Sequence, residues 1–486
     1  TCVSSSGTPV AGSGGCPAGA AVSNQSSFVS ALRSSLSGQR VLFKCGDTFT
    51  GDNAVVQGIT FSVGAYGSCV GTTSGRPIFS DSGSTGEISI GSGSGATYDG
   101  RISDLDLEGN SSGYVGVAAG GSYNYYQITL NNLLSHGNTT NYDYYNDTQW
   151  GLIEVVASGQ GATVGTFIND SENQCVNGNQ SYNCGGTPNF VNVSYNAVMG
   201  GRFDGTGAPN NGHGIETFRV SACRLCVFAN NTFENANNIG ATFKLHSGNP
   251  NSQNQWIGQY TELVEISDNL FTGTSGAQLV EIAPQNNETD ERLRNIVFER
   301  NLVYGIAGNS NKLLVSVHNG SFRNNAFNGT VTSGVDYGIQ IAQRGSEYTP
   351  SANFPCSNAV GVCPGSAPVY IEVYNNTCYV KGGNGCIGFD GANFIAPANS
   401  SWAANNMMYN SSGGTTVRDS GSGNAVSNNT ASAASDPGFA DVSGTYKFLS
   451  DYLPTANYAG GISVANFFDA LGEAWSPTWD LGAVHH

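Results

Sequence analysis

Short apolar stretches recur along the chain, and each ends in an asparagine that is usually followed by one apolar residue and then by polar or glycine residues. Within the stretches apolar and polar positions tend to alternate, as they do in β-strands whose side chains point to two opposite faces. The pattern predicts many short strands that repeat one structural unit. Its asparagines are Asn132, Asn196, Asn231, Asn269, Asn301, Asn325, Asn376, Asn406 and Asn429.

The spacing of these asparagines indicates how the strands are arranged. Steps of 35, 38, 32, 24, 30 and 23 residues separate neighbours, with larger gaps where loops are inserted. Strands at this period, without intervening helices, predict a β-solenoid in which each coil stacks on the next. Asparagine suits the turn because it tolerates left-handed backbone geometry and its amide can bond to the asparagine of the next coil. We therefore expect a ladder of asparagines.

The composition agrees with a chain rich in strands. Its 486 residues include 67 Gly and only 3 Met, with much Ser, Thr and Asn, which favours strands and turns over helices. A β-propeller is the alternative repeat fold, but its blades recur more evenly, at about 40 to 50 residues, and carry a Trp-Asp signature that does not recur in this sequence. The preferred fold class is an all-β single solenoid.

The two ends of the chain depart from the repeat. Residues 23–38 have an apolar helical face, which predicts an amphipathic helix that caps the open end of the solenoid. The face comprises Phe28, Val29, Leu32 and Leu36. We expect an N-terminal segment with its capping helix over 1–37, a solenoid over 38–432 and a C-terminal tail, packed on the solenoid, over 433–486.

The repeat over roughly residues 38–430 resembles the right-handed parallel β-helix superfamily. That superfamily includes pectate lyases, polygalacturonases, alginate lyase and chondroitinase B-like enzymes, and phage tailspikes. The resemblance implies a single right-handed parallel β-helix and a secreted protein that acts on polysaccharide. It is specific for the fold rather than for an activity.

One strand of each coil has an inward apolar pair with a single outward residue between its members. The pairs are Ile153 and Val155, Phe218 and Val220, Phe243 and Leu245, Val280 and Ile282, Val315 and Val317, and Ile339 and Ile341. The outward column is then Glu154, Arg219, Lys244, Glu281, Ser316 and Gln340, with Asp390 as its extension. Two residues further along the same face lie His246 and His318. The column predicts a polar strip along one outer sheet.

This strip has two interpretations. It can be a solvated ladder of ion pairs, which stabilises a sheet modestly. It can also be a binding groove, because Lys and His are scarce in the chain and two stacked cations, Arg219 and Lys244, would repel one another without a ligand. We prefer the groove.

Charge and cysteine content bear on partners and location. The formal net charge of −17 disfavours nucleic acid and anionic membranes, and no apolar run is long enough to span a membrane. Twelve cysteines form six near-neighbour pairs, which predicts local disulfides in an oxidising compartment. The first residues lack a basic start and an apolar region, so we interpret the chain as a mature secreted protein from which a signal peptide was removed.

Cations beside carboxylate and imidazole suit an acidic polysaccharide as substrate. They can neutralise a uronate carboxylate while a base removes the neighbouring C5 proton, which is β-elimination. A Lys desolvated beside another cation can act as the base, and Arg stays charged. We predict catalytic roles for Lys244, Arg219, His246, Glu281 and Glu216, and substrate-binding roles for His213, Glu154, His318, Gln340 and Asp390.

Two local motifs add enzyme alternatives. The segment NNTFENANNIGATFKLHSG resembles alginate lyase and chondroitinase B-like enzymes, which implies elimination and a possible Ca²⁺ site, with Glu262, Glu265 and Glu281 as candidates. Gly212-His213-Gly214 with the later Phe243-Lys244-Leu245 resembles polygalacturonases, which implies a hydrolase. Its paired carboxylates would be Glu216 with Glu281, or Asp204 with Glu216.

A function without catalysis is the remaining alternative. Disulfide-bonded solenoids with few charges also serve as adhesins or self-assembling filaments, so an oligomer or filament stays open. The aromatic clusters at 122–127 and 141–150 could bind sugar by stacking.

Overall fold

The computed structural model describes the chain in segments. They are residues 1–32, 36–72, 74–82, 88–90, 95–97, 99–108, 117–119, 123–125, 128–136, 153–156, 193–194, 197–204, 218–221, 223–234, 241–246, 260–275, 279–283, 292–307, 312–330, 337–343, 367–381, 384–391, 396–410, 413–430, 438–441, 448–455 and 483.

A sheet of sixteen strands, here called the long sheet, runs along the molecule. In spatial order it contains β2 (Val22–Asn24), β1 (Cys2–Ser4), β3 (Gln39–Lys44), β6 (Thr60–Tyr66), β10 (Asp99–Ser103), β14 (Ile128–Asn131), β16 (Ile153–Val156), β18 (Ala197–Met199), β21 (Cys223–Ala229), β24 (Tyr260–Ser267), β27 (Arg292–Glu299), β30 (His318–Arg323), β33 (Ile371–Tyr374), β37 (Trp402–Ala404) and β40 (Ala425–Ser427), with β17 (Val193–Ser194) beside β21.

Two further sheets complete the later coils. The second sheet has β19 (Arg202–Asp204), β22 (Thr232–Glu234), β25 (Leu270–Ser275), β28 (Leu302–Ala307), β31 (Ala326–Thr330), β34 (Thr377–Lys381) and β38 (Met407–Asn410). The third sheet has β20 (Phe218–Ser221), β23 (Phe243–His246), β26 (Val280–Ile282), β29 (Leu313–Val315), β32 (Tyr337–Gln343), β35 (Gly385–Phe389) and β39 (Thr415–Asp419), with β36 (Ala396–Pro397) beside β32.

Smaller sheets take these places in the early coils. They are β15 (Leu134–His136), β11 (Asp106–Glu108), β7 (Ile78–Asp81) and β4 (Thr48–Gly51); β12 (Val117–Ala119), β8 (Ile88–Ile90) and β5 (Ala54–Val56); and β13 (Tyr123–Tyr125) with β9 (Gly95–Thr97).

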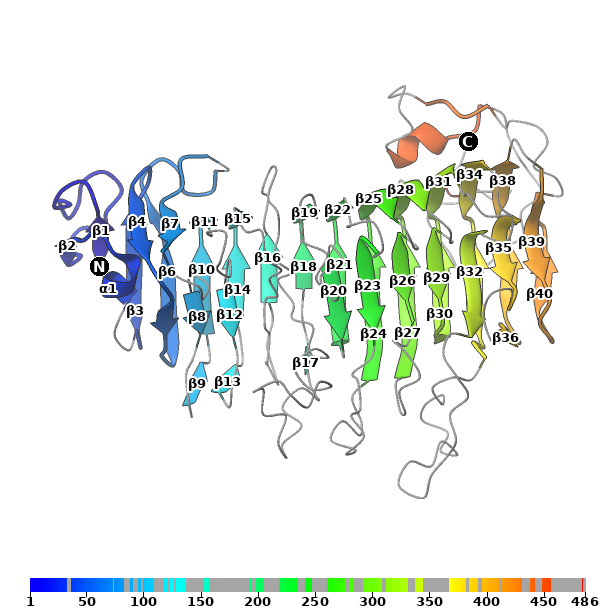
Figure 1. The fold of residues 1–486 in the computed structure, drawn as a ribbon, viewed down its shortest axis with the longest axis horizontal. Helices are drawn as coiled ribbons and strands as arrows, with labels where there is room; N and C mark the ends of the chain where they lie inside the picture. Colours follow the sequence, from blue (N-terminus) through cyan, green and yellow to red (C-terminus); the bar gives the residue numbers. More distant parts are fainter. Residues whose placement is uncertain are drawn as a thin grey trace, which may run out of the picture.

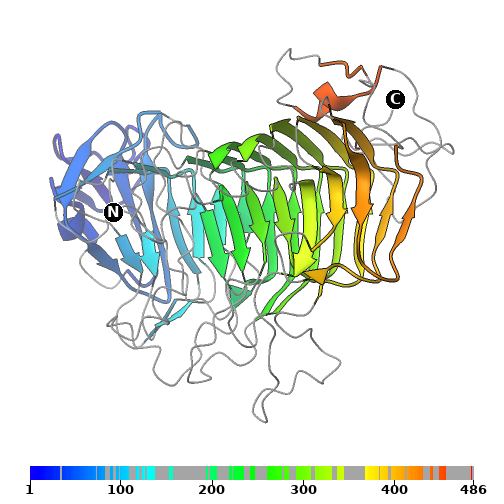
Figure 2. The same cartoon turned by 45° about the vertical axis from the view of Figure 1, so that its right-hand side comes forward.

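The strands of successive coils pair in parallel along the whole molecule. A strand of the long sheet leads into the second sheet and then the third sheet before the chain returns one coil further on, as Figures 1 and 2 show. Of the strand pairs in the described segments, β32 with β36 is antiparallel. The chain is therefore a right-handed parallel β-helix, as the repeat predicted.

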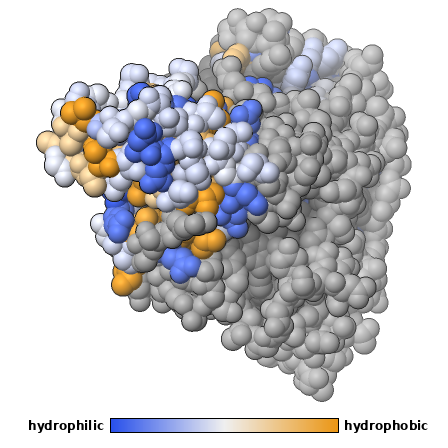
Figure 3. Space-filling view, turned by 60° about the vertical axis from the view of Figure 1, so that its left-hand side comes forward, coloured by the Kyte–Doolittle hydropathy of each residue, from blue (hydrophilic) through white to orange (hydrophobic). Residues whose placement is uncertain are grey.

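The interior is one continuous apolar core that extends from the first coil to the last. Equivalent positions stack from coil to coil: Phe218 lies over Phe243 with ring centroids 5.8 Å apart, and Phe233 lies over Phe271 at 5.2 Å. Each buried Phe contributes about 1.5–3 kcal/mol through removal of apolar surface from water. At the outer surface of the N-terminal end, apolar areas are separated by hydrophilic side chains (Figure 3), a distribution typical of a face in water.

The expected asparagine ladder runs through the later coils, between the long sheet and the second sheet. The side-chain oxygen of each asparagine accepts the backbone N–H of its counterpart in the preceding coil at 2.9–3.1 Å. Its side-chain nitrogen donates to a backbone carbonyl of the preceding coil at 2.8–3.0 Å. The members are Asn231, Asn269, Asn301, Asn325, Asn376, Asn406 and Asn429.

One expected member of the ladder, Asn132, is wrong, and another is not described. Asn132 has left-handed backbone, with φ 52°, and lies one residue before the ladder position. In this coil the ladder position is held by the buried Leu133. Asn196 lies outside the described residues. In the described part of that coil, the N–H of Gly201 donates to the side-chain oxygen of Asn231 at 2.9 Å. The left-handed residue is thus the one before the ladder asparagine, for example Arg300 at φ 53° before Asn301.

The ends of the solenoid are built as follows. Helix α1 spans Phe28–Leu32, and Phe28 stacks on Phe79 at 4.7 Å in the first coils; its role as a cap stays a prediction. Strands β1 and β2 continue the long sheet beyond β3. In the C-terminal segment, the 3₁₀ helix η1 (Leu449–Tyr452) buries Tyr452 against the second sheet (Figure 1). None of the described helices is long and apolar enough to cross a membrane.

Three of the expected disulfides are formed, with Cα–Cα distances of 6.1, 5.7 and 5.5 Å. They join Cys2 to Cys16, Cys45 to Cys69 and Cys378 to Cys386. Cys226 is also disulfide-bonded. Cys175, Cys184, Cys356 and Cys363 lie outside the described residues.

A lysine is buried where the second and third sheets meet. Lys312 precedes β29, has no exposed surface, and its ammonium donates a hydrogen bond to the carbonyl of Gly305 in β28. Burial lowers the pKa of Lys312 to about 7, because removal from water disfavours the charged ammonium.

We predict that the ladder contributes measurably to stability. In Asn301→Ala, the N–H of Asn269 and the carbonyl of Ile266 lose buried hydrogen bonds. Each of the two buried groups left without a partner costs about 1–3 kcal/mol, so we expect a loss of about 2–6 kcal/mol, measured by urea denaturation. Asn24→Ala, on an exposed position of β2, is the control and should change stability little. Equal unfolding midpoints for Asn301→Ala and the unmodified protein would contradict the ladder's role.

We also predict a pH-dependent effect of Lys312→Met. Between about pH 7 and the ordinary lysine pKa of about 10.5, the unfolded chain binds a proton at residue 312 that the folded chain does not, so the unmodified protein gains stability as pH rises. Methionine has no such proton. The stability of Lys312→Met relative to the unmodified protein should therefore be highest at pH 7 and below, and should fall as pH rises.

Thermal unfolding across this pH range measures the effect. Leu279→Ala, which alters a buried residue that does not titrate, is the control and should show a difference independent of pH. A constant difference for Lys312→Met would show that Lys312 is not desolvated as described.

Candidate functional site

The third sheet brings three of the predicted site residues onto consecutive strands. Phe218, Phe243 and Val280 are in register and fully buried. The next residues along β20, β23 and β26 are Arg219, Lys244 and Glu281, and these are also in register. Strands in a sheet are about 4.8 Å apart, so three charged residues follow one another in a single column. The order Arg219, Lys244, Glu281 is the one predicted from the sequence.

Lys244 and Glu281 form an ion pair that is mostly shielded from water. The ammonium nitrogen lies 3.7 Å from Oε2 of Glu281, and the side chains are 13% and 3% exposed. A negative charge at this distance favours the charged ammonium. Lys244 is therefore held beside a carboxylate, and its predicted catalytic role stays a prediction.

His246 is placed on the same strand, two residues beyond Lys244 and opposite Ser221 of β20. Positions two residues apart share one face of a strand, about 7 Å from one another along the strand. Its position relative to Lys244 is thus the predicted one.

Beyond Glu281, the residues of the column differ from those predicted. Leu314, rather than Ser316, is opposite Glu281, because the inward pair of β29 is Leu313 and Val315. The sequence LLVSV offers two apolar pairs, and the wrong one was chosen. Gln340 is in the column as expected, but the next position is Gly388.

Asp390 lies two residues beyond the column and belongs to a separate polar cluster. Its carboxylate accepts hydrogen bonds from the hydroxyls of Tyr337 (2.5 Å) and Ser420 (3.1 Å) and pairs with Arg418 at 3.2 Å. Its backbone carbonyl accepts from the amide of Gln340 at 2.8 Å. Burial, with the nearby Asp390, raises the pKa of Tyr337, so this phenol stays a donor.

This cluster joins β32 and β39 to the segments that follow β35 and β39. Asp390 is 5% exposed and Gln340 is 1% exposed. A side chain at Gly388 would collide with the Tyr337 ring, because its Cβ would lie only 2.8 Å from the ring carbons. We therefore interpret Gln340 and Asp390 as structural, although their predicted contact with substrate stays a prediction.

Two predicted site residues lie on another sheet. Glu154 is in β16 of the long sheet, opposite Thr129 and Ala197. His318 begins β30 of the long sheet, opposite Arg294. Both placements on the strip were wrong, because apolar alternation has the same period in all three sheets and does not show which sheet a strand joins. His213 and Glu216 lie outside the described residues.

The three carboxylates suggested for Ca²⁺ are not brought together. Glu262 and Glu265 are in β24 of the long sheet, whereas Glu281 is in β26 of the third sheet. Glu262 pairs with Arg294 at 2.5 Å. Within the described segments, no group of three or more His, Cys, Asp or Glu side chains could hold a metal ion.

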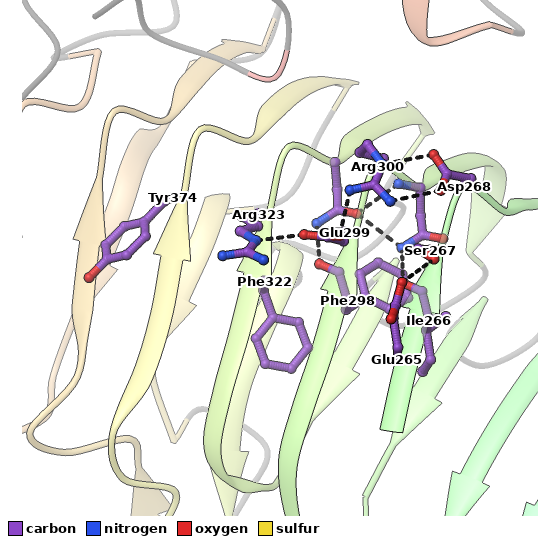
Figure 4. A network of polar contacts seen from close by, with 12 residues as sticks. Glu265, Ile266, Ser267, Asp268, Phe298, Glu299, Arg300, Phe322, Arg323 and Tyr374 are labelled. Carbon is purple, nitrogen blue, oxygen red and sulfur yellow. Dashed lines mark hydrogen bonds and ion pairs between the residues drawn. The ribbon is translucent and has the colours of Figure 1, made fainter. Parts of the chain in front are cut away.

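A second charged network, which the sequence analysis missed, follows the ladder turn (Figure 4). Arg300 donates two hydrogen bonds to the carboxylate of Asp268, both at 2.9 Å, and also contacts Glu299. Glu299 accepts a further bond from Arg323 at 2.6 Å. Hydrogen bonding to Asp268 raises the pKa of Arg300. The charges neutralise one another, so the network stabilises neighbouring coils.

The signal for this network is the residue before each ladder asparagine. Asp268 precedes Asn269 and Arg300 precedes Asn301, and both have left-handed backbone, with φ 58° and 53°. Charged residues at successive left-handed positions stack at the spacing of the coils, so opposite charges there predict ion pairs.

No known family pattern matches the chain, and no curated protein sequence matches it. Among solved structures, the Dettilon tailspike protein is 10% identical with a TM-score of 0.45, and the match covers 80% of this chain and 62% of that one. Pectate lyase Pel9A is 14% identical with a TM-score of 0.40, covering 100% and 96%. The PL6 family alginate lyase AlyGC is 14% identical with a TM-score of 0.41, covering 83% and 49%. This chain thus spans less than two thirds of the tailspike and alginate lyase chains.

We predict energetic coupling between Lys244 and Glu281. The test is a double-mutant cycle with Lys244→Met and Glu281→Gln. The sum of the two single-variant losses in unfolding free energy should exceed the loss in the double variant by about 0.5–3 kcal/mol, because either single change leaves one shielded charge without its partner. Urea denaturation of the four proteins measures the coupling. Additive losses would contradict the ion pair.

Proposed function

We propose that the outer face of the third sheet binds an acidic polysaccharide and cleaves it by β-elimination. The observation that supports this most is the register of Arg219 with Lys244 on adjacent strands, followed by Glu281. Glu281 offsets only one of these two cations, so the three residues together keep one net positive charge that favours an anionic ligand. A uronate carboxylate has the charge and the bidentate geometry that such a pair recognises.

The reaction needs a carboxylate binder and a base. Arg219 and Lys244 would hold the uronate carboxylate and stabilise the negative charge that develops there when the C5 proton leaves. We assign proton removal to His246, since a neutral imidazole accepts protons near pH 7 and this residue is on the same face as Lys244. The C5–H electrons form the C4–C5 double bond, the C4–O bond breaks, and the departing oxygen takes a proton from solvent.

Glu281 would hold the Lys244 side chain in place rather than react. Its carboxylate is almost fully buried and lies 3.7 Å from the Lys244 ammonium. A substrate carboxylate could then approach Lys244 from its exposed side. In this mechanism His246 is the base and Lys244 binds the carboxylate. In the mechanism predicted from the sequence, a lowered pKa makes Lys244 the base.

We predict that Lys244→Met lowers kcat/KM for elimination by about 100-fold or more, which is the usual effect of removing one group that stabilises developing negative charge. The assay incubates the protein with polygalacturonate, alginate, chondroitin and neutral polysaccharides. It follows ultraviolet absorbance of the unsaturated product and, separately, new reducing ends.

Arg294→Met is the matched control, because Arg294 also pairs with a buried glutamate but on the long sheet, with side chains 22% and 5% exposed. It should keep elimination activity. Reducing ends without absorbance would indicate a hydrolase, and binding without either product would indicate a protein that does not cleave. Elimination that is unaffected by Lys244→Met would exclude this site.

A further inference from the structure

The long sheet has a groove on its outer face, away from the third sheet. The groove has a volume of about 430 Å³ and crosses β24, β27, β30 and β33. Its lining includes Leu263, Glu265, Asn295, Asn319, Ser321 and Glu372. None of these residues belongs to the strip around Lys244, so the groove is a separate site.

A column of left-handed residues shapes the groove. Leu263, Asn295 and Asn319 lie at matching positions of β24, β27 and β30, and Tyr370 directly precedes β33 at the same level. Their φ angles are 57°, 56°, 55° and 58°. A left-handed residue within a strand bends it and re-aims the side chains beside it. Because the bend recurs in each coil, it extends the hollow along the solenoid axis.

Two exposed aromatic rings continue the groove toward the C-terminus. Tyr370 is 56% exposed and Trp402 is 39% exposed. Their rings are stacked, with centroids 6.4 Å apart and planes 24° from parallel. Trp402 is opposite Glu372, so the aromatic pair directly follows the groove lining. Exposed aromatic rings next to a hollow indicate a binding site, because they offer flat apolar surface at little entropic cost.

The polar lining is suited to hydroxyl groups. The amide nitrogen of Asn319 donates to the amide oxygen of Asn295 at 2.5 Å, which leaves further donor and acceptor capacity on both amides. The hydroxyl oxygen of Ser321 is buried and has no hydrogen-bond partner in the described part of the structure. The amides and carboxylates of the lining can pair with the several hydroxyls of a sugar ring.

The charge of the groove selects among sugars. Glu265 and Glu372 both line it, and the described residues of its lining include no Lys or Arg. Glu265 accepts a hydrogen bond from Ser267 at 2.8 Å, where the charged network of Figure 4 begins. Two carboxylates would repel a uronate, whereas they accept hydrogen bonds from neutral hydroxyls.

We propose that this groove binds a neutral oligosaccharide, with sugar rings stacked on Tyr370 and Trp402 and hydroxyls bonded by Asn319 and Glu372. From β24 to β37 there are four steps between strands, which is about 19 Å and suits a short chain of sugars rather than one ring. The protein would thus hold a neutral glycan on one face independently of the reaction proposed for the third sheet.

The test is isothermal titration calorimetry with cellotetraose, mannotetraose, maltotetraose, xylotetraose and, as acidic probe, tetragalacturonate. We expect at least one neutral tetrasaccharide to bind. Trp402→Ala should weaken that binding tenfold or more, and Ser321→Leu, which fills the groove without touching the rings, should also weaken it. Phe448→Ala is the matched control, because Phe448 is 61% exposed but lies in the C-terminal segment, and it should bind normally.

Circular dichroism and melting temperature establish that each variant is folded, and Ser321→Leu tests the groove if Trp402→Ala does not fold. Lys244→Met should keep neutral-sugar binding, which separates this proposal from the one for the third sheet. Absence of binding to every neutral probe, or unchanged affinity in both groove variants, would overturn the proposal. So would a preference for tetragalacturonate, or self-association that depends on Trp402 without any sugar binding.

Discussion

The structure depends on hydrogen bonds that join each coil to the next. In a parallel sheet, the backbone groups of one coil find hydrogen-bond partners only when the neighbouring coil is in place. At the turn, where strand pairing stops, the side-chain amides of the ladder asparagines supply these partners. Because Asn301 has no exposed surface, all of its polar groups must be bonded within the protein. Every outward residue is therefore held at a spacing set by the backbone, which is what allows columns of side chains to act together.

The two proposed sites use this spacing in different ways. On the third sheet, like and unlike charges follow one another on adjacent strands, and Glu281 is shielded enough to hold Lys244 firmly. On the long sheet, repeated left-handed residues and uncharged amides give a hollow with aromatic rings beside it. The first favours anions and the second favours neutral hydroxyls. A polysaccharide with both kinds of sugar could contact both faces.

The sequence predicted the fold because the asparagine turn recurs with one chemistry. It also predicted the order of Arg219, Lys244 and Glu281, because each stands between two unambiguous apolar neighbours. It did not predict Leu314, since Val315 has an apolar residue two positions away on either side. The groove was missed because its left-handed positions hold chemically unrelated residues, such as Leu263, Asn295 and Tyr370, so that only the backbone shows the repeat.

The ladder geometry is nearly independent of how much chain lies between its members. Asn301 and Asn325 are 24 residues apart in sequence and Asn325 and Asn376 are 51 apart, yet the same bonds form at 2.9 and 3.1 Å. Closing a loop twice as long costs only about 0.6 kcal/mol more. Loops between coils can therefore lengthen or be exchanged in evolution while the sheets keep their register, so this scaffold can acquire new ligand specificity by insertion without a new core.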